Sequence, residues 1–285
     1  MALEMRGMPV ARAIVSSLRP RVAGLGSGGV TPTLAIVRVG AREDDLAYER
    51  GAKKRCAEAG IAVRTIELDA GCTQQELEGA IARVNEDAGI HGCLMFRPLP
   101  ESLDETAACE ALDPAKDVDG ITRQSMVGVF ANQEMGFPPC TAQAVVDLLD
   151  HYGVELEGAD VCVLGRSLVI GKPVSLMLQA RNATVTMCHT RTRDLAGKCR
   201  AAQVLVVAAG HPNTIGARDV SAGQVVVDVG INWDERAQRL CGDVAYDEVA
   251  RKVGGITPVP GGVGSVTTAV LAKHVVMAAE RATRG

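Results

Sequence analysis

Aromatic residues are scarce in this sequence, whose 285 residues include one Trp, three Tyr and three Phe. Hydrophobic residues still make up 47%, so most of the apolar surface must come from aliphatic side chains. That is enough to build a folded core, which excludes a disordered or collagen-like chain. Proteins that stack RNA bases need clustered rings beside a basic groove, so this class is disfavoured as well. With so few rings available, each one is a candidate for a specific contact.

An excess of charge of either sign is also missing. Thirty basic and 34 acidic residues give a formal net charge of −4, which predicts no nucleic-acid partner and no anionic membrane partner. The apolar runs fall short of the roughly 20 residues that a membrane span needs. The segment from Met1 to Arg6 contains Glu4 and lacks the long apolar core of a secretory signal. We therefore expect a cytoplasmic protein.

Cysteine and histidine occur without the spacing of metal ligands. The nine cysteines are scattered singly between Cys56 and Cys241 with no C-x-x-C pair, and the five histidines are equally dispersed. This pattern is typical of free thiols in a reducing compartment. It predicts no zinc site and no other metal site.

Short apolar runs alternate with helical stretches along the whole chain, which is typical of an α/β fold with mainly parallel sheets. A turn-rich change near residues 120–140 predicts two α/β domains, residues 1–120 and 140–267. The final helix, within residues 265–282, could complete either domain. The expected strands are 32–39, 62–68, 92–96, 160–164, 184–188, 204–208 and 225–229, and the expected helices include 44–59, one after a Thr73 cap, and 142–152 after a Thr141 cap.

The most informative local feature is a glycine-rich turn that directly follows the strand expected at 160–164. It reads Gly165-Arg166-Ser167-Leu168-Val169-Ile170-Gly171-Lys172-Pro173 and precedes a helical stretch expected at 174–180. A glycine turn between a strand and a helix lets backbone N–H groups approach a pyrophosphate, and the helix N-terminus favours the anion. The spacing differs from G-x-G-x-x-G, so an ordinary strand-to-helix turn is the alternative.

Arginine occupies the place where a dinucleotide fold reads the ribose. Arg191 follows the next expected strand, 184–188, and Arg166 lies in the turn itself. An acidic residue there would favour NAD, whereas the planar fork of arginine suits a 2′-phosphate. We therefore expect NADP, with NAD still possible; the alternative is that both arginines are solvated surface charges.

Several motifs occur together in one order: KDVDG (Lys116–Gly120), PPCTAQ (Pro138–Gln143), the glycine turn, VVDVGIN (Val226–Asn232) and TPVPGGVG (Thr257–Gly264). From about residue 8 to residue 280, the chain resembles the methylenetetrahydrofolate dehydrogenase/cyclohydrolase family of the bacterial FolD type. The resemblance implies an N-terminal folate-binding catalytic domain, completed by a C-terminal helix at about 268–285, and a C-terminal Rossmann-type NAD(P)-binding domain. It further implies a homodimer, with folate in a cleft between the two domains of each subunit.

The resemblance also implies the reactions and the site residues. The family oxidises 5,10-methylenetetrahydrofolate with NADP, sometimes with NAD, and many members then hydrolyse the methenyl product to 10-formyltetrahydrofolate. Tyr48 corresponds to the tyrosine that stacks on the folate, and Asp119 to the carboxylate that hydrogen-bonds the pterin; the alternative for Asp119 is a turn cap before Gly120. The other implied contacts are Pro260, Gly261 and Gly262 for the substrate, and Gly165, Arg166, Ser167, Ile170, Gly171, Pro173, Thr141 and Ile231 for the cofactor.

Two positions depart from the family pattern. The lysine that drives the cyclohydrolase step stands four residues after the tyrosine, where this chain has Ala52, and its glutamine partner is replaced by Phe96. Lys53 lies well round the helix from Tyr48 at about 100° per residue. Cys140 is interpreted as a packing residue.

We therefore expect an active dehydrogenase with weak or absent cyclohydrolase activity, which relies on a separate cyclohydrolase. The first alternative is a bifunctional enzyme in which Lys53 or Lys54 reaches the site through a helix distorted at Gly51. A non-catalytic folate-binding or nucleotide-binding protein and a two-domain dehydrogenase of amino or hydroxy acids are the others.

Overall fold

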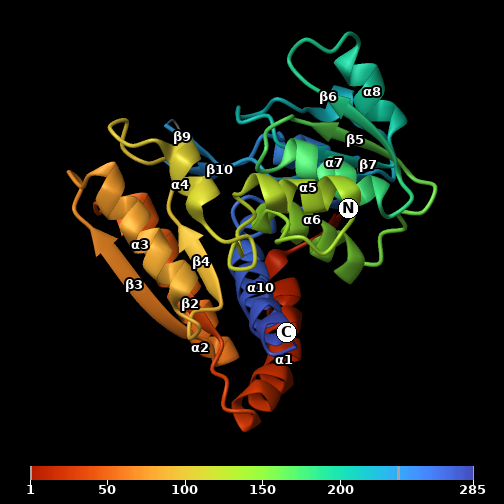
Figure 1. Cartoon of the computed structure of the whole chain (residues 1–285). Coiled ribbons are helices and arrows are strands. Elements are labelled where there is room, and N and C mark those ends of the chain that lie inside the picture. Colours follow the sequence, from red (N-terminus) through yellow and green to blue (C-terminus); the bar gives the residue numbers. More distant parts are fainter. Residues whose placement is uncertain (1, 236–237, 285) are drawn as a thin grey trace. The chain divides into compact units, whose positions relative to one another are not determined.

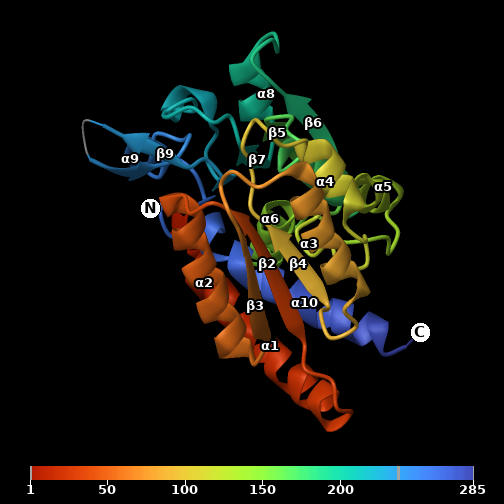
Figure 2. The same cartoon turned by 60° about the vertical axis from the view of Figure 1, so that its left-hand side comes forward.

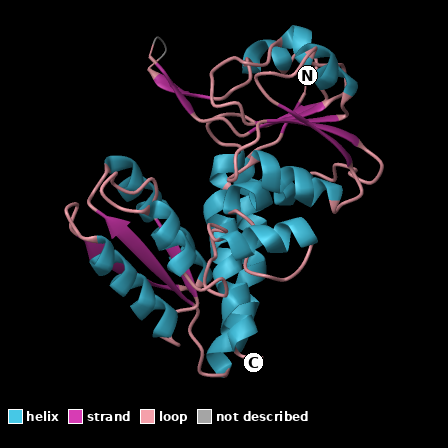
Figure 3. Cartoon of the chain, turned by 45° about the horizontal axis from the view of Figure 1, so that its top comes forward, coloured by secondary structure: helices cyan, strands magenta, loops and turns pink. Residues whose placement is uncertain are grey.

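The computed structural model describes residues 2–235 and 238–284, which divide into two compact units. The three-stranded unit combines residues 12–140 with 268–284, and the six-stranded unit combines residues 2–11 with the described part of 141–267. The chain thus starts in the six-stranded unit, leaves it, returns and leaves again. Both units contain helices and parallel strands, which confirms the expected two-domain α/β class (Figure 3).

The three-stranded unit is built on a parallel sheet in the order β3-β2-β4. Its central strand β2 (Thr33–Val39) is buried at every residue, as its nearly continuous apolar sequence predicts. The flanking strands are β3 (Ala62–Leu68) and β4 (Gly92–Met95), and the helices are α1 (Gly7–Ser27, which begins in the six-stranded unit), α2 (Glu43–Ala59), α3 (Gln74–Glu86), α4 (Glu105–Ala111), α5 (Arg123–Ala131) and α10 (Thr267–Ala282, whose first residue belongs to the other unit).

Helices cover both faces of this sheet (Figure 2). Alternate β2 residues pack with Leu77 and Ile81 of α3, whereas Arg38, on the other face, contacts Glu49 of α2. Helix α2 has three acidic residues in its first turn, where the positive end of the helix dipole favours negative charge. The helix stops at Gly60, whose φ of 80° is a left-handed cap that glycine adopts without strain. The length and position of α2 set where Tyr48 and Ala52 lie.

The six-stranded unit has the sheet order β1-β11-β8-β7-β5-β6, and all strand pairs of this sheet are parallel. From β5 the chain runs to the edge strand β6 and then returns to β7 on the other side of β5 (Figure 1). The carboxyl ends of β5 and β7 therefore flank the point where a doubly wound sheet binds its ligand. The elements are β1 (Leu3–Glu4), α6 (Cys140–His151, starting at the boundary), β5 (Asp160–Leu164), α7 (Gly171–Gln179), β6 (Thr184–Cys188), α8 (Leu195–Ala201), β7 (Val204–Val207), β8 (Val225–Asp228), the antiparallel pair β9 (Asn232–Asp234) and β10 (Arg239–Cys241), α9 (Tyr246–Val249) and β11 (Gly255–Ile256), with short 3-10 turns at Ala217–Asp219 and Val263–Ser265.

All seven expected strands are present within one residue of their predicted ends. Two helix starts were wrong: α6 begins at Cys140, so Thr141 lies in its first turn and is not its cap, and α7 begins at Gly171, three residues before the expected stretch. Helix α5 lies inside the segment taken as the domain boundary. Within residues 2–235 and 238–284, every helix is too short or too polar to cross a bilayer.

Candidate functional site

The Lys116–Gly120 loop is fixed at its start by a cation at the end of a helix. Lys116 Nζ donates to the carbonyl oxygens of Val84, Asn85 and Asp87, at 2.7, 2.8 and 2.8 Å, where α3 ends. A positive charge at this end of a helix is favourable, because the last carbonyl groups have no partner within the helix. Lys116 therefore ties the loop to α3.

The middle of the loop is fixed by Asp117, which is fully buried. Its carboxylate accepts hydrogen bonds from the backbone N–H groups of Ile121 and Thr122 and from the hydroxyl group of Ser125. Gly120 has a φ of 69°, and a Cβ there would come within 2.5 Å of the Pro139 nitrogen, so the loop requires glycine at this position. The turn-capping role that the sequence left open for Asp119 belongs to Asp117.

Asp119, two residues further on, is half-buried. Burial of the carboxyl group raises its pKa to about 6; a hydrogen bond with Cys140 lowers it, nearby Asp117 raises it and the charge of Arg97 lowers it. The Cys140 thiol also lies 3.3 Å from the Val118 carbonyl oxygen. The interpretation of Cys140 as packing was therefore incomplete, because this residue also makes polar contacts beside Asp119.

Tyr48 and Phe96 lie against one another in the same unit. Their ring centroids are 5.9 Å apart and the ring planes meet at 87°, an edge-to-face contact that aromatic pairs favour. Phe96 follows β4 directly, and Ala52, one helical turn after Tyr48, is fully buried. Both positions where the family pattern has a polar pair therefore hold apolar side chains in packed surroundings.

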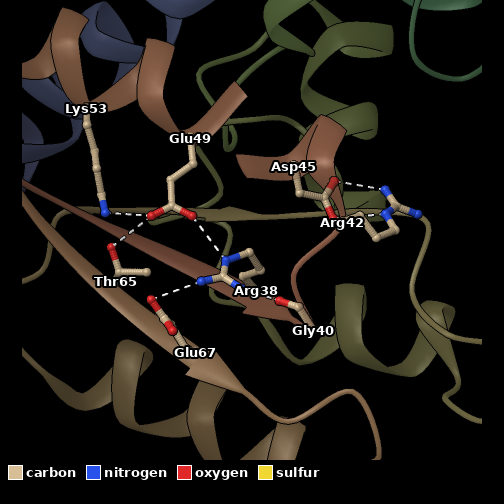
Figure 4. A network of polar contacts seen from close by, with 8 residues as sticks. All are labelled: Arg38, Gly40, Arg42, Asp45, Glu49, Lys53, Thr65 and Glu67. Atoms are coloured by element: carbon tan, nitrogen blue, oxygen red, sulfur yellow. Dashed lines mark hydrogen bonds and ion pairs between the residues drawn. The ribbon is translucent and has the colours of Figure 1, made fainter. Parts of the chain in front are cut away.

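Lys53 takes part in a different cluster, on the α2 face that meets the sheet (Figure 4). Its Nζ lies 2.5 Å from Glu49 Oε1, while Glu49 Oε2 accepts from Arg38 Nε at 3.1 Å. Arg38 also pairs with Glu67 of β3 at 2.9 Å. Burial acts to raise the pKa of Glu49, but the hydrogen bonds and charges of Lys53 and Arg38 outweigh it, so the pKa is lowered. The Lys53 ammonium group is thus engaged with an ionised carboxylate, roughly 140° round the helix from Tyr48.

The glycine turn has the shape of a cradle for a phosphate-bearing ligand. Gly165 has a φ of 136°, and a Cβ there would collide with the Ala208 carbonyl oxygen. A Cβ on Gly171 would collide with the Gly165 carbonyl group. Since α7 starts at Gly171, its N-terminus packs directly on the turn, and Pro173 is tolerated because it lies in the first turn of the helix. The residues therefore fit a dinucleotide pyrophosphate.

The two arginines expected to read a 2′-phosphate come from neighbouring strand ends. Arg166 follows β5 and Arg191 follows β6, and both side chains are exposed. The turn bearing Arg191 is held by hydrogen bonds from the His189 backbone N–H to Thr192 Oγ1 and from the Arg191 backbone N–H to His189 Nδ1. The Gly165 N–H donates to the Cys188 carbonyl oxygen at 2.9 Å, so the two turns are directly linked.

The substrate-loop glycines and Ile231 line one pocket of about 260 Å³ in the six-stranded unit. The pocket is formed by residues 228–231, Leu240 and residues 258–265, so it contains Pro260, Gly261 and Gly262. Thr141 lies apart from this lining, in α6. In the part of the chain that the structure describes, no cluster of three or more His, Cys, Asp or Glu side chains is arranged to hold a metal ion.

The fold and the turn define a class: a two-unit α/β protein whose doubly wound sheet carries a dinucleotide-type turn. Residues 5–119 match the family model "Tetrahydrofolate dehydrogenase/cyclohydrolase, catalytic domain", and residues 139–283 match "Tetrahydrofolate dehydrogenase/cyclohydrolase, NAD(P)-binding domain". This chain belongs to the tetrahydrofolate dehydrogenase/cyclohydrolase family, as its motifs predicted.

Two relatives and a solved structure match this chain over almost its full length. The chain is 50% identical over 273 residues to the Bifunctional protein FolD of Clostridioides difficile, covering 96% of this chain and 95% of that protein. It is 49% identical over 281 residues to the Bifunctional protein FolD of Carboxydothermus hydrogenoformans, covering 98% of each. The crystal structure of the bifunctional enzyme FolD from Campylobacter jejuni has a TM-score of 0.95 at 36% identity, with 99% of both chains covered.

A further solved structure bears on the cofactor. The Trypanosoma brucei N5,N10-methylenetetrahydrofolate dehydrogenase-cyclohydrolase, complexed with NADP and an inhibitor, has a TM-score of 0.92 at 36% identity, covering 100% of this chain and 99% of that one. The six-stranded unit of the present chain is accordingly an NAD(P)-binding domain.

Proposed function

We propose that this protein oxidises 5,10-methylenetetrahydrofolate to 5,10-methenyltetrahydrofolate with NADP⁺, and that it hydrolyses the methenyl product weakly or not at all. The observation that supports both parts is the contrast between two sites. The cofactor turn and the Lys116–Gly120 loop keep the residues of the family motifs in tightly packed turns, whereas Ala52 and Phe96 stand where the family pattern has the polar pair used in hydrolysis.

In the oxidation, NADP⁺ accepts a hydride, and the protein supplies binding and orientation. The ionised Asp119 carboxylate accepts hydrogen bonds from N–H donors of the aminopterin ring, and Tyr48 stacks on that ring, held at its edge by Phe96. The glycine turn and the α7 N-terminus hold the pyrophosphate, and Ser167, Ile170 and Pro173 maintain the turn. The loop at Pro260, Gly261 and Gly262 lets the substrate come close to the backbone. Ile231 and Thr141 are further contacts to the cofactor.

Hydrolysis of the methenyl product requires that water is activated and a proton is moved. General acid–base groups increase the rate of such steps roughly 10²–10⁴-fold. Ala52 has no proton to give, and Phe96 cannot hydrogen-bond a lysine. Lys53, the nearest substitute in the sequence, is paired with Glu49. The cell would therefore rely on a separate cyclohydrolase.

The cofactor preference and the assembly extend the same proposal. Arg166 and Arg191 favour NADP over NAD, because both are exposed beside the turn with their guanidinium groups available to a 2′-phosphate. We propose a homodimer in the cytoplasm, in which residues 1–120 with the helix at 268–285 bind folate and residues 140–267 bind the cofactor. The free state of all nine cysteines is consistent with a reducing compartment.

A coupled absorbance assay on the purified protein tests the proposal. We expect NADPH and methenyltetrahydrofolate to form in equal amounts from methylenetetrahydrofolate and NADP⁺, faster than with NAD⁺. The methenyl absorbance should then decay no faster than in a protein-free control. Rapid enzyme-dependent decay would favour the bifunctional alternative, in agreement with the names of the curated relatives. A lack of NADPH formation would contradict the dehydrogenase function itself.

A further inference from the structure

Asp243 is a fully buried carboxylate in the six-stranded unit, and both of its oxygen atoms accept hydrogen bonds. Oδ2 accepts from the backbone N–H groups of Ala209 and Gly210, at 2.6 and 2.8 Å. Oδ1 accepts from the side-chain amide of Asn232 at 2.8 Å. Ala209 and Gly210 follow β7, and Asn232 is the first residue of β9, directly after the short loop that follows β8. One side chain thus joins the loops after two neighbouring strands.

A second buried carboxylate holds Asp243 in place. Asp228, the last residue of β8, accepts through Oδ1 from the N–H groups of Gly230 and Asp243, at 2.9 and 3.1 Å, and through Oδ2 from the Val244 N–H at 2.9 Å. A Cβ on Gly230 would collide with the Asp243 carboxyl group, and a Cβ on Gly242 would collide with that of Asp228. Glycine is required at both positions because the two carboxylates pack against the backbone there.

The loops that Asp243 joins border the place where the dinucleotide binds. The Ala208 carbonyl oxygen fills the space beside Gly165, so the segment after β7 lies against the glycine turn. Residues 228–231, after β8, line the pocket of about 260 Å³. Both segments leave the carboxyl ends of parallel strands, where a doubly wound sheet binds its ligand (Figure 1).

We propose that Asp243 is a positioning residue for the dinucleotide: its carboxylate sets the spacing between the loop at 208–210 and the loop at 229–232. Asp243 is fully buried and acts only through these loops. The inference rests on the proposed function, because it takes NADP as the ligand.

The substitution Asp243→Leu tests it, because leucine has nearly the shape of aspartate but accepts no hydrogen bond. The Ala209 and Gly210 N–H groups and the Asn232 amide then lose their acceptor together. A buried donor without an acceptor is costly, and both loops should shift. We expect the Kd for NADPH, measured by calorimetry on the full-length protein, to rise on the order of ten-fold, with kcat at saturating NADP⁺ close to that of the wild type.

The conservative substitution Asp243→Asn is the decisive variant. Its side-chain oxygen can accept from the Ala209 and Gly210 N–H groups while its NH2 group donates to the oxygen of an Asn232 amide that has turned over, so every donor again meets an acceptor. NADPH affinity should stay within about two-fold of the wild type, while Asn232→Asp alone weakens binding because two carboxylates then face each other. If Asp243→Leu does not fold, the half-buried Asn232→Ala variant, which removes only the Oδ1 link, should still raise the Kd several-fold.

Asp219→Leu is the matched control, since Asp219 is also buried and accepts from a backbone N–H, that of Gly216 at 2.9 Å, but joins no loop of the pocket. It should leave the NADPH Kd unchanged. The inference is overturned if Asp243→Asn binds no better than Asp243→Leu, or if Asp219→Leu weakens binding as much as Asp243→Leu. Wild-type protein that binds no NADPH would contradict the proposed function and this inference together, whereas binding that neither Asp243→Leu nor Asn232→Ala alters contradicts this inference alone.

Discussion

In the proposed function, two apolar residues, Ala52 and Phe96, separate the two reactions of the family. A lysine alone at position 52 would bury an ammonium group without a partner, and a glutamine alone at position 96 would bury an unpaired amide, so either single change carries a cost. Losing both partners of a polar pair avoids that cost. The edge-to-face contact of Phe96 with Tyr48 then adds packing to the ring that we propose stacks on folate.

The double substitution Ala52→Lys with Phe96→Gln should restore hydrolysis. The amide gives the buried ammonium group a partner, and the lysine supplies an acid–base group, so the rate of methenyl decay should increase at least about ten-fold. Thermal unfolding would show whether Ala52→Lys alone destabilises more than the pair. Lys53→Ala is the control for the alternative proton donor: we expect it to leave the residual hydrolysis rate unchanged, and a loss of that rate would identify Lys53 as the donor.

The raised pKa of Asp119 predicts opposite pH effects on activity and on stability. In the proposed function, folate binding needs the ionised carboxylate, so kcat/KM for methylenetetrahydrofolate should fall as the pH drops through about 6. The folded protein holds this proton more tightly than the unfolded chain, whose value is near 3.8, so stability should fall as the pH rises from about 4 to 6. Asp119→Asn should remove the activity loss and the Asp119 share of the stability change, and should weaken folate binding; Asp228, whose pKa burial also raises to about 6, keeps its own effect on stability. Activity that rises as the pH falls below 6 would contradict the role of the ionised form.

At the scale of elements, the end of α3 and the Lys116–Gly120 loop form one structure. Three carbonyl groups of the helix terminus are bonded by a single ammonium group, although burial lowers the pKa of Lys116. The loop also follows β4 closely, since the Cys93 N–H donates to the Lys116 carbonyl oxygen at 2.7 Å. The position of Asp119 therefore depends on a helix that supplies none of the expected folate contacts.

Lys116→Met keeps the aliphatic stem and removes the three bonds. We expect a loss of about 1–3 kcal/mol in the free energy of unfolding, from urea denaturation, because buried carbonyl groups lose a charged donor. The KM for methylenetetrahydrofolate should rise while the KM for NADP⁺ stays the same. Lys252→Met, which removes one exposed bond to the Ala217 carbonyl oxygen, is the control and should change neither KM. Equal effects of the two substitutions on the folate KM would contradict a specific role of Lys116 in positioning the Asp119 loop.

The elements differ in how well the sequence predicted them. The strand Asp160–Leu164 and the turn at Gly165 were predictable, since a short apolar run with two valines stops directly at a glycine. In the structure Gly165 has a positive φ, which glycine adopts without strain. The helix starts at Cys140 and Gly171 were not predictable: Pro139 and Ile170, the residues before them, have no side chain that can cap a helix, so the sequence has no start signal there. The ion cluster around Glu49 was missed as well: its partners come from α2, β2 and β3, and nothing in the local pattern links them.

At the scale of the whole molecule, the motifs predicted the order of the two functional parts but not which chain segments build each sheet. The strand Leu3–Glu4 joins the six-stranded sheet beside Gly255–Ile256, about 250 residues later in the sequence. Two residues in an extended conformation carry too weak a pattern to be assigned from the sequence. Long-range pairing of this kind can be seen only in the folded chain.

The path of the chain between the units has a consequence for biosynthesis. The six-stranded unit owns residues 2–11 and the three-stranded unit owns residues 268–284, so each unit includes an end of the chain that lies outside its main segment. On the ribosome, the first strand must wait for Gly255–Ile256, and residues 12–140 must wait for α10. Vectorial folding can complete the six-stranded unit only after Gly255–Ile256 is made, and the three-stranded unit only after α10 is made. A split of the gene near codon 140 would yield two fragments, each lacking a piece of its own fold.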